Sequence, residues 1–179
     1  MKTAAILLIS GMTWFCGGHA RAEVRQVAEN AFTIETTVLT NASPAEAYRA
    51  LGNVAAWWDP GHTYSGSSKN LGLQMQAGGC FCETLPSGGS VEHGRVINVQ
   101  PGVLLRLDTA LGPLQDMAVA GVLSFALAPD GPGTRITMTY RVSGAMTLEA
   151  GKLAPMVDGV LGGQLSRLKA YGDSLKPAK

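Results

Sequence analysis

The sequence is poor in cysteine and in charged residues, and each shortage excludes a class of protein. Its 179 residues include only three cysteines, too few for a disulfide scaffold. Charged residues make up 15% of the chain and the formal net charge is +1, so there is no sign of the clustered basic face of a nucleic-acid-binding protein. A hydrophobic fraction of 46% excludes a disordered chain. The length fits a single globular domain.

The N-terminus lacks a hydrophobic run long enough to span a bilayer, but it is organised like a secretory signal peptide. A positively charged start precedes a mostly apolar run over 3–18, shorter than the ~20 residues of a membrane-spanning helix. Ala20-Arg21-Ala22 follows as an A-x-A cleavage signal. We therefore predict a signal peptide over 1–22, a single mature domain over 23–179, and a secreted, periplasmic protein without an integral membrane segment. A membrane anchor and a lipoprotein attached through Cys16 are the less favoured alternatives.

Strand patterns and glycine- or proline-rich turns fill the middle of the mature chain, with helical patterns on either side. The segment from Glu23 to Thr40 is rich in β-branched residues, which predicts one long strand. Ser43-Pro44-Ala45-Glu46 has the spacing of a capping box and predicts a helix that ends near Gly52. A second short helix is expected over 54–58. Six strands should follow, at 71–76, 79–85, 91–99, 103–109, 119–128 and 134–142.

The C-terminal segment predicts a long amphipathic helix. Apolar residues recur at three- and four-residue spacing from Leu153 to Leu175, and we expect the helix to be firm from Pro155. The order of elements predicts an α+β fold in which a curved antiparallel sheet of about six to seven strands wraps around this helix. Because a strongly bent sheet cannot pack flat along one helix, we expect a cavity between them.

Several stretches of the mature chain have the character of family landmarks. They are Ser43-Pro44-Ala45-Glu46-Ala47-Tyr48 with Trp57-Trp58, Gly78-Gly79-Cys80-Phe81-Cys82-Glu83, Gly94-Arg95-Val96, Gly133-Thr134-Arg135-Ile136-Thr137 and the helical pattern over 157–168. Together they resemble the SRPBCC (START-like, helix-grip) superfamily, closest to secreted members of its chaperone-ATPase-activator and polyketide-cyclase-like branch. The resemblance implies the helix-grip fold. It does not select a function, because carriers, cyclases and protein-binding modules share this scaffold.

Large side chains near the expected cavity are the candidates for lining it, together with a few polar groups that would give specificity. The predicted ligand-binding residues are Trp57, Trp58, Tyr64, Phe81, Glu83, His93, Arg95, Phe125, Met138 and Tyr140. Most such aromatic residues belong to the core of a protein, but a preformed cavity requires some of them as lining. The leading hypothesis is a protein that binds a small, mostly apolar molecule, with no cofactor and no nucleic acid partner.

His93 is the candidate for acid–base chemistry, because an imidazole beside a carboxylate can move a proton near neutral pH. With Glu83 or Asp59 as its partner, it would serve a cyclase- or dehydratase-like enzyme, which is the alternative function. A polar cross-strand pair that fixes the strand register is the favoured interpretation of this residue, so enzymatic activity is the less favoured hypothesis. A protein-interaction module is a third hypothesis, which the export signal disfavours.

Cys80 and Cys82 lie two residues apart on a predicted strand and therefore share a face. One register of the hairpin around the turn at 86–89 places Cys80 opposite Arg95 and Cys82 opposite His93. A register shifted by one residue instead places Glu83 opposite His93, and the sequence leaves both open.

The two cysteines allow three interpretations. In the first register Cys80, Cys82 and His93 are weak candidates for metal ligands, with His62 or Asp59 as a fourth. A disulfide, either local or between two molecules, is the second interpretation. A pair of small, buried apolar side chains is the third and is favoured over the other two.

Overall fold

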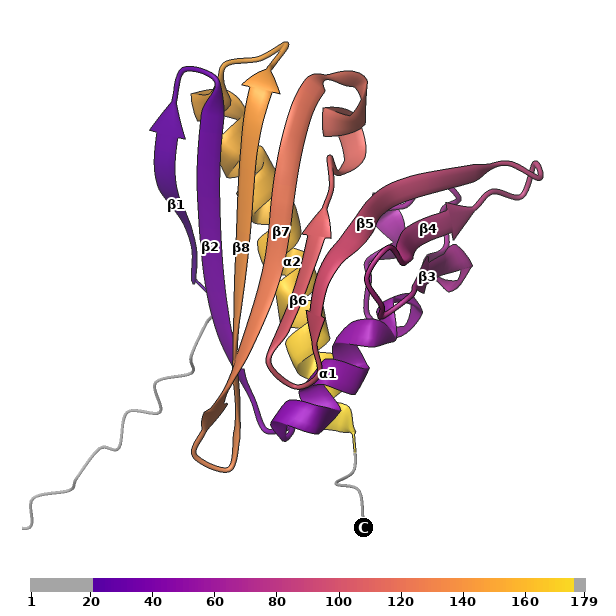
Figure 1. The fold of residues 1–179 in the computed structure, drawn as a ribbon, viewed down its shortest axis with the longest axis vertical. Helices are drawn as coiled ribbons and strands as arrows, with labels where there is room; N and C mark the ends of the chain where they lie inside the picture. Colours follow the sequence, from indigo (N-terminus) through magenta and orange to yellow (C-terminus); the bar gives the residue numbers. More distant parts are fainter. Residues whose placement is uncertain (1–20, 176–179) are drawn as a thin grey trace, which may run out of the picture.

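Eight antiparallel strands form one curved sheet in the computed structural model, which describes residues 21–175 (Figure 1). Their bounds are β1 (Arg21–Ala28), β2 (Ala31–Thr40), β3 (Leu71–Leu73), β4 (Cys80–Thr84), β5 (Ser90–Gln100), β6 (Leu104–Asp108), β7 (Ala118–Asp130) and β8 (Gly133–Ala145). The order in the sheet is β1-β2-β8-β7-β6-β5-β4-β3. The α+β helix-grip architecture is confirmed, with eight strands in place of the six or seven expected.

The additional strand comes from the N-terminal segment. Where the sequence predicts one long strand, the chain turns at Glu29 and Asn30, and β1 pairs with β2 as a hairpin from Ala28 opposite Ala31. The single-strand prediction is wrong because this two-residue turn contains neither glycine nor proline, so no such residue marks the end of β1 in the sequence. Residues 1–20, which include most of the predicted signal peptide, lie outside the described residues.

The helix α1 (Pro44–Gly52) begins with the predicted capping box. The Ser43 hydroxyl accepts from the Glu46 N–H, and the Glu46 carboxylate accepts from the Ser43 N–H at 3.0 Å. The predicted short helix over 54–58 is reduced to a single 3-10 turn, η1 (Val54–Ala56). Two further 3-10 turns, η2 (Pro60–His62) and η3 (Ser68–Asn70), shape the segment that leads to β3.

The long helix α2 (Ala150–Ser174) crosses one face of the sheet and packs mainly on β1 and β2 (Figure 1). It begins five residues before Pro155, because Ala150, Leu153 and Ala154 are already buried. Its last turn is fastened to the end of β2: the Asp173 carboxylate accepts from the Thr40 hydroxyl at 2.7 Å. Within residues 21–175, no helix is long and apolar enough to span a membrane.

A β-bulge in β5 breaks the alternation of side chains in the β4–β5 hairpin. Cys80 lies opposite Arg95, but beyond a register shift Cys82 lies opposite Glu92, so His93 is an extra residue in β5. As a result the consecutive residues His93 and Gly94 are both buried. The Cys80–Arg95 pairing of the first predicted register is observed. The pairings predicted for His93, with Cys82 or with Glu83, are both wrong, because an alternation pattern does not reveal an inserted residue.

Glycine is required at the bulge. A Cβ atom on Gly94 would lie 2.7 Å from the Cβ of Thr109, closer than two carbon atoms can approach. The Thr109 hydroxyl also donates to the carbonyl of His93. β6 and the residue after it therefore hold the bulge in place and fix the side of the sheet on which the imidazole emerges.

Candidate ligand cavity

A cavity of about 680 Å³ lies between the first half of α2, the short helix η4 (Gly112–Asp116) and the segment that follows η1. Its size falls in the range of small-molecule sites, about 300–1,000 Å³. The lining residues are mostly apolar: Trp58, His62, Thr63, Tyr64, His93, Leu111, Gly112, Pro113, Leu114, Asp116, Met117, Leu148, Leu153, Met156, Val157, Val160 and Leu161. Such a wall favours an apolar molecule, because burying apolar surface against it is favourable.

His93 is the buried polar residue of this wall. Its side chain is 7% exposed, whereas His62, Tyr64 and Asp116 are exposed and Thr63 is half-buried. The imidazole packs against the ring of Phe81 with centroids 5.0 Å apart, and against the ring of Tyr64 at 5.8 Å. The cavity therefore combines an apolar surface with one polar group held in a fixed orientation.

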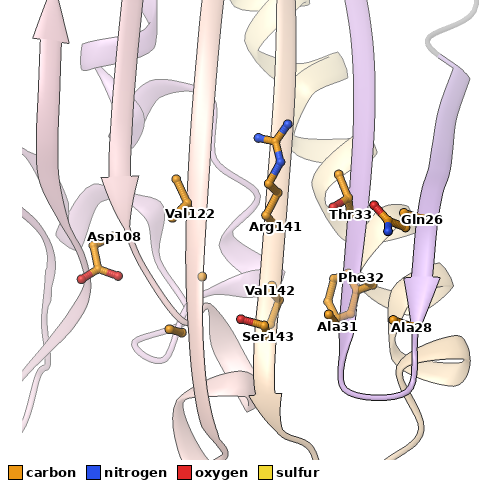
Figure 2. A pocket seen from close by; sticks show the side chains of 12 residues that line it. Gln26, Ala28, Ala31, Phe32, Thr33, Asp108, Val122, Arg141, Val142 and Ser143 are labelled. Atoms are coloured by element: carbon orange, nitrogen blue, oxygen red, sulfur yellow. The ribbon is translucent and has the colours of Figure 1, made fainter.

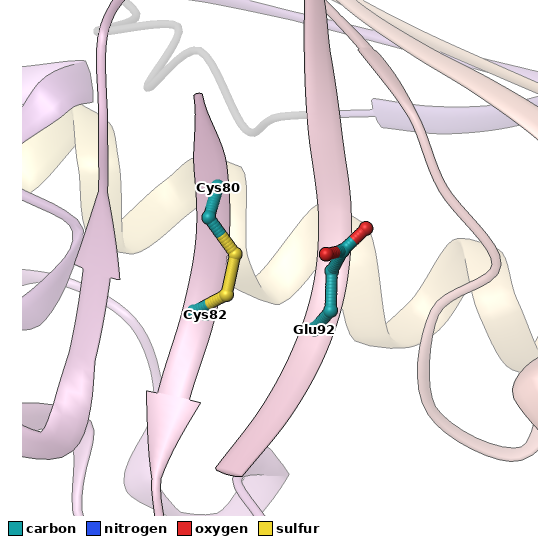
Figure 3. A group of neighbouring side chains, drawn as sticks. All are labelled: Cys80, Cys82 and Glu92. Carbon is teal, nitrogen blue, oxygen red and sulfur yellow. A yellow bond between two sulfur atoms is a disulfide. The ribbon is translucent and has the colours of Figure 1, made fainter. Parts of the chain in front are cut away.

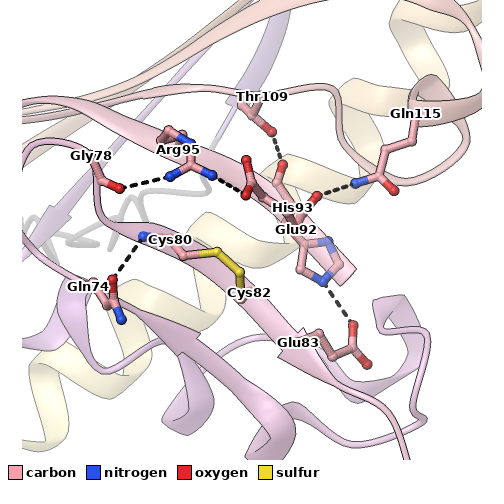
Figure 4. Close-up of a disulfide and its surroundings, with 10 residues drawn as sticks. All are labelled: Gln74, Gly78, Cys80, Cys82, Glu83, Glu92, His93, Arg95, Thr109 and Gln115. Carbon is pink, nitrogen blue, oxygen red and sulfur yellow. Dashed lines mark hydrogen bonds and ion pairs between the residues drawn. A yellow bond between two sulfur atoms is a disulfide. The ribbon is translucent and has the colours of Figure 1, made fainter. Parts of the chain in front are cut away.

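Glu83 supports the imidazole from behind. Its carboxylate lies 2.9 Å from His93 Nε2 (Figure 4) and also accepts hydrogen bonds from the backbone N–H groups of Tyr64 and Ser65. Burial raises the pKa of the Glu83 carboxyl, but the hydrogen bonds from Ser65, Tyr64 and His93 outweigh burial and hold the pKa below its ordinary value. Glu83 is thus ionised at neutral pH.

This ionised carboxylate sets the tautomer of a neutral His93. A carboxylate can only accept, so the hydrogen bond requires the proton on Nε2. Nδ1 then carries a lone pair, and it has no hydrogen-bond partner among residues 21–175. His93 lines the cavity, so Nδ1 of its neutral form is the atom of this side chain to which a bound molecule would donate.

Tyr64 links the two loops beside the cavity. Its hydroxyl lies 3.2 Å from the carbonyl of Gly112 and donates to it, and Gln115 Oε1 lies 3.4 Å away. Gln115 in turn donates through Nε2 to the carbonyl of Glu92 at 2.9 Å. Since Glu83 also holds the Tyr64 backbone, β4, β5, η4 and the segment after η2 form one hydrogen-bonded rim.

Three of the predicted ligand-binding residues, Trp58, Tyr64 and His93, line the cavity, and the others lie elsewhere. Phe81 and Glu83 are buried behind His93. Trp57 donates to the carbonyl of Ala50 in the core.

The remaining candidates belong to the core or to the outer face of the sheet. Phe125, Met138 and Tyr140 are buried in the core and do not line the cavity. The Tyr140 hydroxyl donates to the carbonyl of Thr109 and accepts from the Leu111 N–H, and burial raises its pKa far above the ordinary range. Arg95 is exposed on the outer face, where it pairs with Glu92 and the Gly78 carbonyl.

Asp59 does not reach the imidazole. Its carboxylate accepts from the Gly61 N–H at 3.0 Å and forms an ion pair with Arg167 at 3.0 Å. The hydrogen bond from Gly61 and the charge of Arg167 lower the pKa of Asp59. The partner of His93 is therefore Glu83, and of the two predicted carboxylates only Glu83 can take part in acid–base chemistry at this histidine.

Cys80 and Cys82 form a disulfide on the outer face of β4 (Figure 3). Their sulfur atoms and a carboxylate oxygen of Glu92 lie within 4.8 Å of one another. His93 faces the opposite side, so the predicted set of Cys80, Cys82 and His93 is not brought together. Sulfur atoms joined in a disulfide are not thiolates, which are the form that binds metal ions. The favoured interpretation as buried apolar side chains is also wrong, because both cysteines are half-buried and linked to each other.

A second, smaller hollow of about 320 Å³ lies across β1, β2, β8, β7 and β6 (Figure 2). Arg141, Thr33 and Gln26 project into this region, and Asp108 lies at its far end. None of the predicted site residues lines it. The larger cavity is therefore the better candidate site.

A curved antiparallel sheet that grips a long C-terminal helix, with a cavity beside that helix, defines a helix-grip protein of the SRPBCC superfamily. The chain belongs to the polyketide cyclase / dehydrase and lipid transport family, whose model matches residues 31–173. A comparison with curated protein sequences finds no significant match.

Solved structures share the fold at low sequence identity. Protein MLL2253 from Mesorhizobium loti is 18% identical with a TM-score of 0.59, over 80% of this chain and 98% of that one. Protein EF2215 from Enterococcus faecalis is 16% identical with a TM-score of 0.59, over 88% and 80%. The di-domain ARO/CYC protein StfQ from the steffimycin biosynthetic pathway is 15% identical with a TM-score of 0.55, over 81% and 51%. These likenesses establish the fold alone.

Much of the cavity wall is absent from the sequence-based prediction. The segment 111–117 and the residues of α2, among them Met156 and Val160, carry most of the apolar lining. The three- and four-residue spacing in α2 identifies an apolar face, but it does not distinguish a core face from a cavity face. One signal available in the sequence is Met156, an additional apolar residue beside the stripe that begins at Leu153. In the structure Met156 is 63% exposed.

Proposed function

We propose that the protein binds a small, mostly apolar molecule that carries a hydroxyl or another hydrogen-bond donor. The observation that supports this most directly is the buried His93, which is backed by the ionised Glu83 in the wall of an apolar cavity and whose neutral form has an acceptor at Nδ1. The apolar wall provides affinity through burial, and the single acceptor provides selectivity for a ligand that can donate to it. The family description, which names both polyketide chemistry and lipid transport, agrees with a ligand of this kind.

Export to the periplasm forms part of this proposal. The positively charged start, the short apolar run and the A-x-A motif before Glu23 support it. The Cys80–Cys82 disulfide is consistent with an oxidising compartment, where disulfides persist. The protein would then meet its ligand outside the cytoplasm.

A second candidate function is acid–base catalysis at the same histidine. The Glu83–His93 pair has the arrangement of a general base, because a carboxylate that accepts from one ring nitrogen stabilises the imidazolium formed when the other takes up a proton. A cyclisation or dehydration requires such a proton transfer. Deuterium exchange into a bound probe ketone, such as 2-tetralone in deuterated water, would distinguish this activity from binding alone.

The binding proposal can be tested with two ligands that share the same rings, one with a hydroxyl group and one in which a methyl group replaces the hydroxyl proton. 1-Naphthol can donate to His93, whereas 1-methoxynaphthalene has the same rings and cannot donate. A net hydrogen bond contributes about 0.5–1.5 kcal/mol, so we expect 1-naphthol to bind roughly 2–12-fold more tightly in calorimetric titrations at pH 7. Equal affinities would show that no acceptor is available to the ligand.

Site-directed variants locate the binding. Val160→Trp fills the cavity from α2 and should weaken binding of both ligands by at least about tenfold. Ile97→Trp adds the same side chain at an exposed position of β5 and is the matched control, which should bind as the original protein does. Unchanged affinity in Val160→Trp would place the ligand outside this cavity and overturn the proposal.

A further inference from the structure

The Cys80–Cys82 disulfide joins two residues of the same strand. It closes a ring that spans a sequence separation of two and connects no two elements of the fold. Disulfides stabilise proteins mainly by restricting the unfolded chain, and the effect falls as the closed loop becomes shorter. A structural role would call for a longer loop, so the position of this bond points to another use.

The disulfide is accessible to a reagent from the outer face of the sheet. Both cysteines are half-buried there, and Gly72 of the edge strand β3 is the direct partner of Cys82. Gly72 is exposed, and a Cβ atom built on it would meet no other atom within 4 Å. The sulfur of Cys82 therefore borders open space, because Gly72 has no side chain that would fill it.

The charged neighbours of the two sulfur atoms favour one direction of cleavage. Arg95 is the direct cross-strand partner of Cys80, and directly opposed residues place their Cβ atoms about 4.5–5.5 Å apart. The guanidinium, which also pairs with Glu92, can stabilise a thiolate at Cys80. Glu92 is the direct partner of Cys82, and its carboxylate disfavours a thiolate at that position. A thiolate that attacks Cys82 from the side of Gly72 would thus expel Cys80, whose thiolate is the better stabilised of the two.

The inner face of the same strand reaches the cavity. Between the two cysteines, Phe81 points inward, and its ring lies 5.0 Å from that of His93 and 5.4 Å from that of Trp58. The Cα atoms of Cys80 and Cys82 are 5.4 Å apart, about 1 Å less than two residues of a regular strand. Opening the disulfide would allow β4 to extend and would shift Phe81 and Glu83 against the cavity wall.

We propose that Cys80–Cys82 is a redox-active disulfide that exchanges with an external dithiol at Cys82 and thereby alters the cavity wall. A thiolate of the dithiol bonds to the Cys82 sulfur, the Cys80–Cys82 bond breaks, and its electron pair leaves with Cys80. The second thiol of the reagent then displaces Cys82, and Cys80 and Cys82 each take up one of the two protons that the dithiol releases. The protein gains two electrons and two protons overall, and the dithiol becomes a disulfide. A low-molecular-weight disulfide reverses the reaction.

The first test compares the reduction of folded and unfolded protein by dithiothreitol, with free thiols alkylated and counted by mass spectrometry. We expect the folded protein to react within about thirtyfold of the rate in denaturant, because the bond is accessible. Protection greater than this would identify a shielded, structural bond and overturn the proposal. With glutathione as a monothiol, the mixed disulfide should form at Cys82 and leave Cys80 open to alkylation. A mixed disulfide mainly at Cys80 would refute the direction of attack.

Valine substitutions at two glycine positions test whether the reagent approaches Cys82 past Gly72. Gly72→Val places a branched side chain next to the sulfur and should slow the reduction of the folded protein at least about fivefold. Gly159→Val makes the same change at an exposed position of α2 with free space around it and should leave the rate unchanged. Equal rates in the two variants would refute the proposed approach.

Hydrogen exchange tests the coupling to the cavity and needs no ligand, so its outcome is independent of the proposed function. The amides of Tyr64 and Ser65 donate to Glu83, and we expect them to exchange at least about threefold faster after reduction. The amide of Thr109, which donates to Gly121, should not change. The double variant Cys80→Ser with Cys82→Ser should be indifferent to dithiothreitol. An unchanged Tyr64 amide, or a uniform increase at all three, would refute the coupling.

Discussion

Replacement of Glu83 by glutamine tests the central feature of the cavity wall. Glu83 is 1% exposed, and its carboxylate accepts from two backbone N–H groups and from His93. Hydrogen bonds to a charged group contribute about 1.5–3 kcal/mol each, and an unsatisfied buried donor costs about 1–3 kcal/mol. In Glu83→Gln the amide NH₂ faces at least one of these donors. We expect the free energy of unfolding of the variant at pH 7 to be about 2–4 kcal/mol lower, which lowers Tm by roughly 4–16 °C.

The pH dependence of this difference follows from the pKa of Glu83. In the folded protein the pKa lies below the ordinary value of 4.5, so the ionised carboxylate stabilises the fold. That stabilisation is fully present above the unfolded pKa and is lost as the pH falls through the folded pKa. Glutamine does not titrate, so the difference in free energy of unfolding between the original protein and Glu83→Gln should become smaller in acid.

Urea unfolding at pH 7 and pH 2.5 measures both expectations in one series. Glu35→Gln is the matched control, because Glu35 is a half-buried glutamate on β2 that pairs with Arg25 at 3.4 Å, and its replacement should cost less than about 1 kcal/mol. If Glu83→Gln proves as stable as the original protein at pH 7, or if the gap is the same at both pH values, the assignment of an ionised, hydrogen-bonded Glu83 is wrong.

Two further predictions concern the core and the N-terminus. Tyr140→Phe should destabilise the protein by about 1–3 kcal/mol in chemical denaturation, because it leaves the Thr109 carbonyl and the Leu111 N–H without their partner; a loss below about 0.5 kcal/mol would contradict this. N-terminal sequencing of the protein exported by a bacterium should begin at Glu23, whereas a chain that retains Met1 would exclude the predicted cleavage.

Local sequence chemistry predicted much of the scaffold. The capping box at Ser43 and Glu46 forms as expected, because it depends on neighbouring residues alone. The strands from Cys80 onward follow from alternation and from turns marked by glycine and proline. The N-terminal hairpin was missed because its turn at Glu29 and Asn30 lacks such residues, and the start of α2 was placed too late because Pro155 lies inside the helix.

The site was less predictable because it depends on pairings between distant segments. The chain has few aromatic residues and histidines, so residue type alone indicates Trp58, Tyr64 and His93 as candidates. Arg95 was wrongly grouped with the cavity, because the register that fixes its face could not be read from the sequence. Val160 and Leu114 resemble ordinary core residues, and only the curvature of the sheet separates a cavity wall from a packed core.

Because of the bulge, His93 is an extra residue of β5 that has no partner in β4. Thr84 pairs with Ser90 and Cys82 with Glu92 on one side of it, and Cys80 pairs with Arg95 on the other. Deletion of His93 alone would leave each of these pairs with its present partner in an uninterrupted ladder. The imidazole in the cavity wall could therefore be gained or lost through a single codon, while the strand pairing on either side of it is kept.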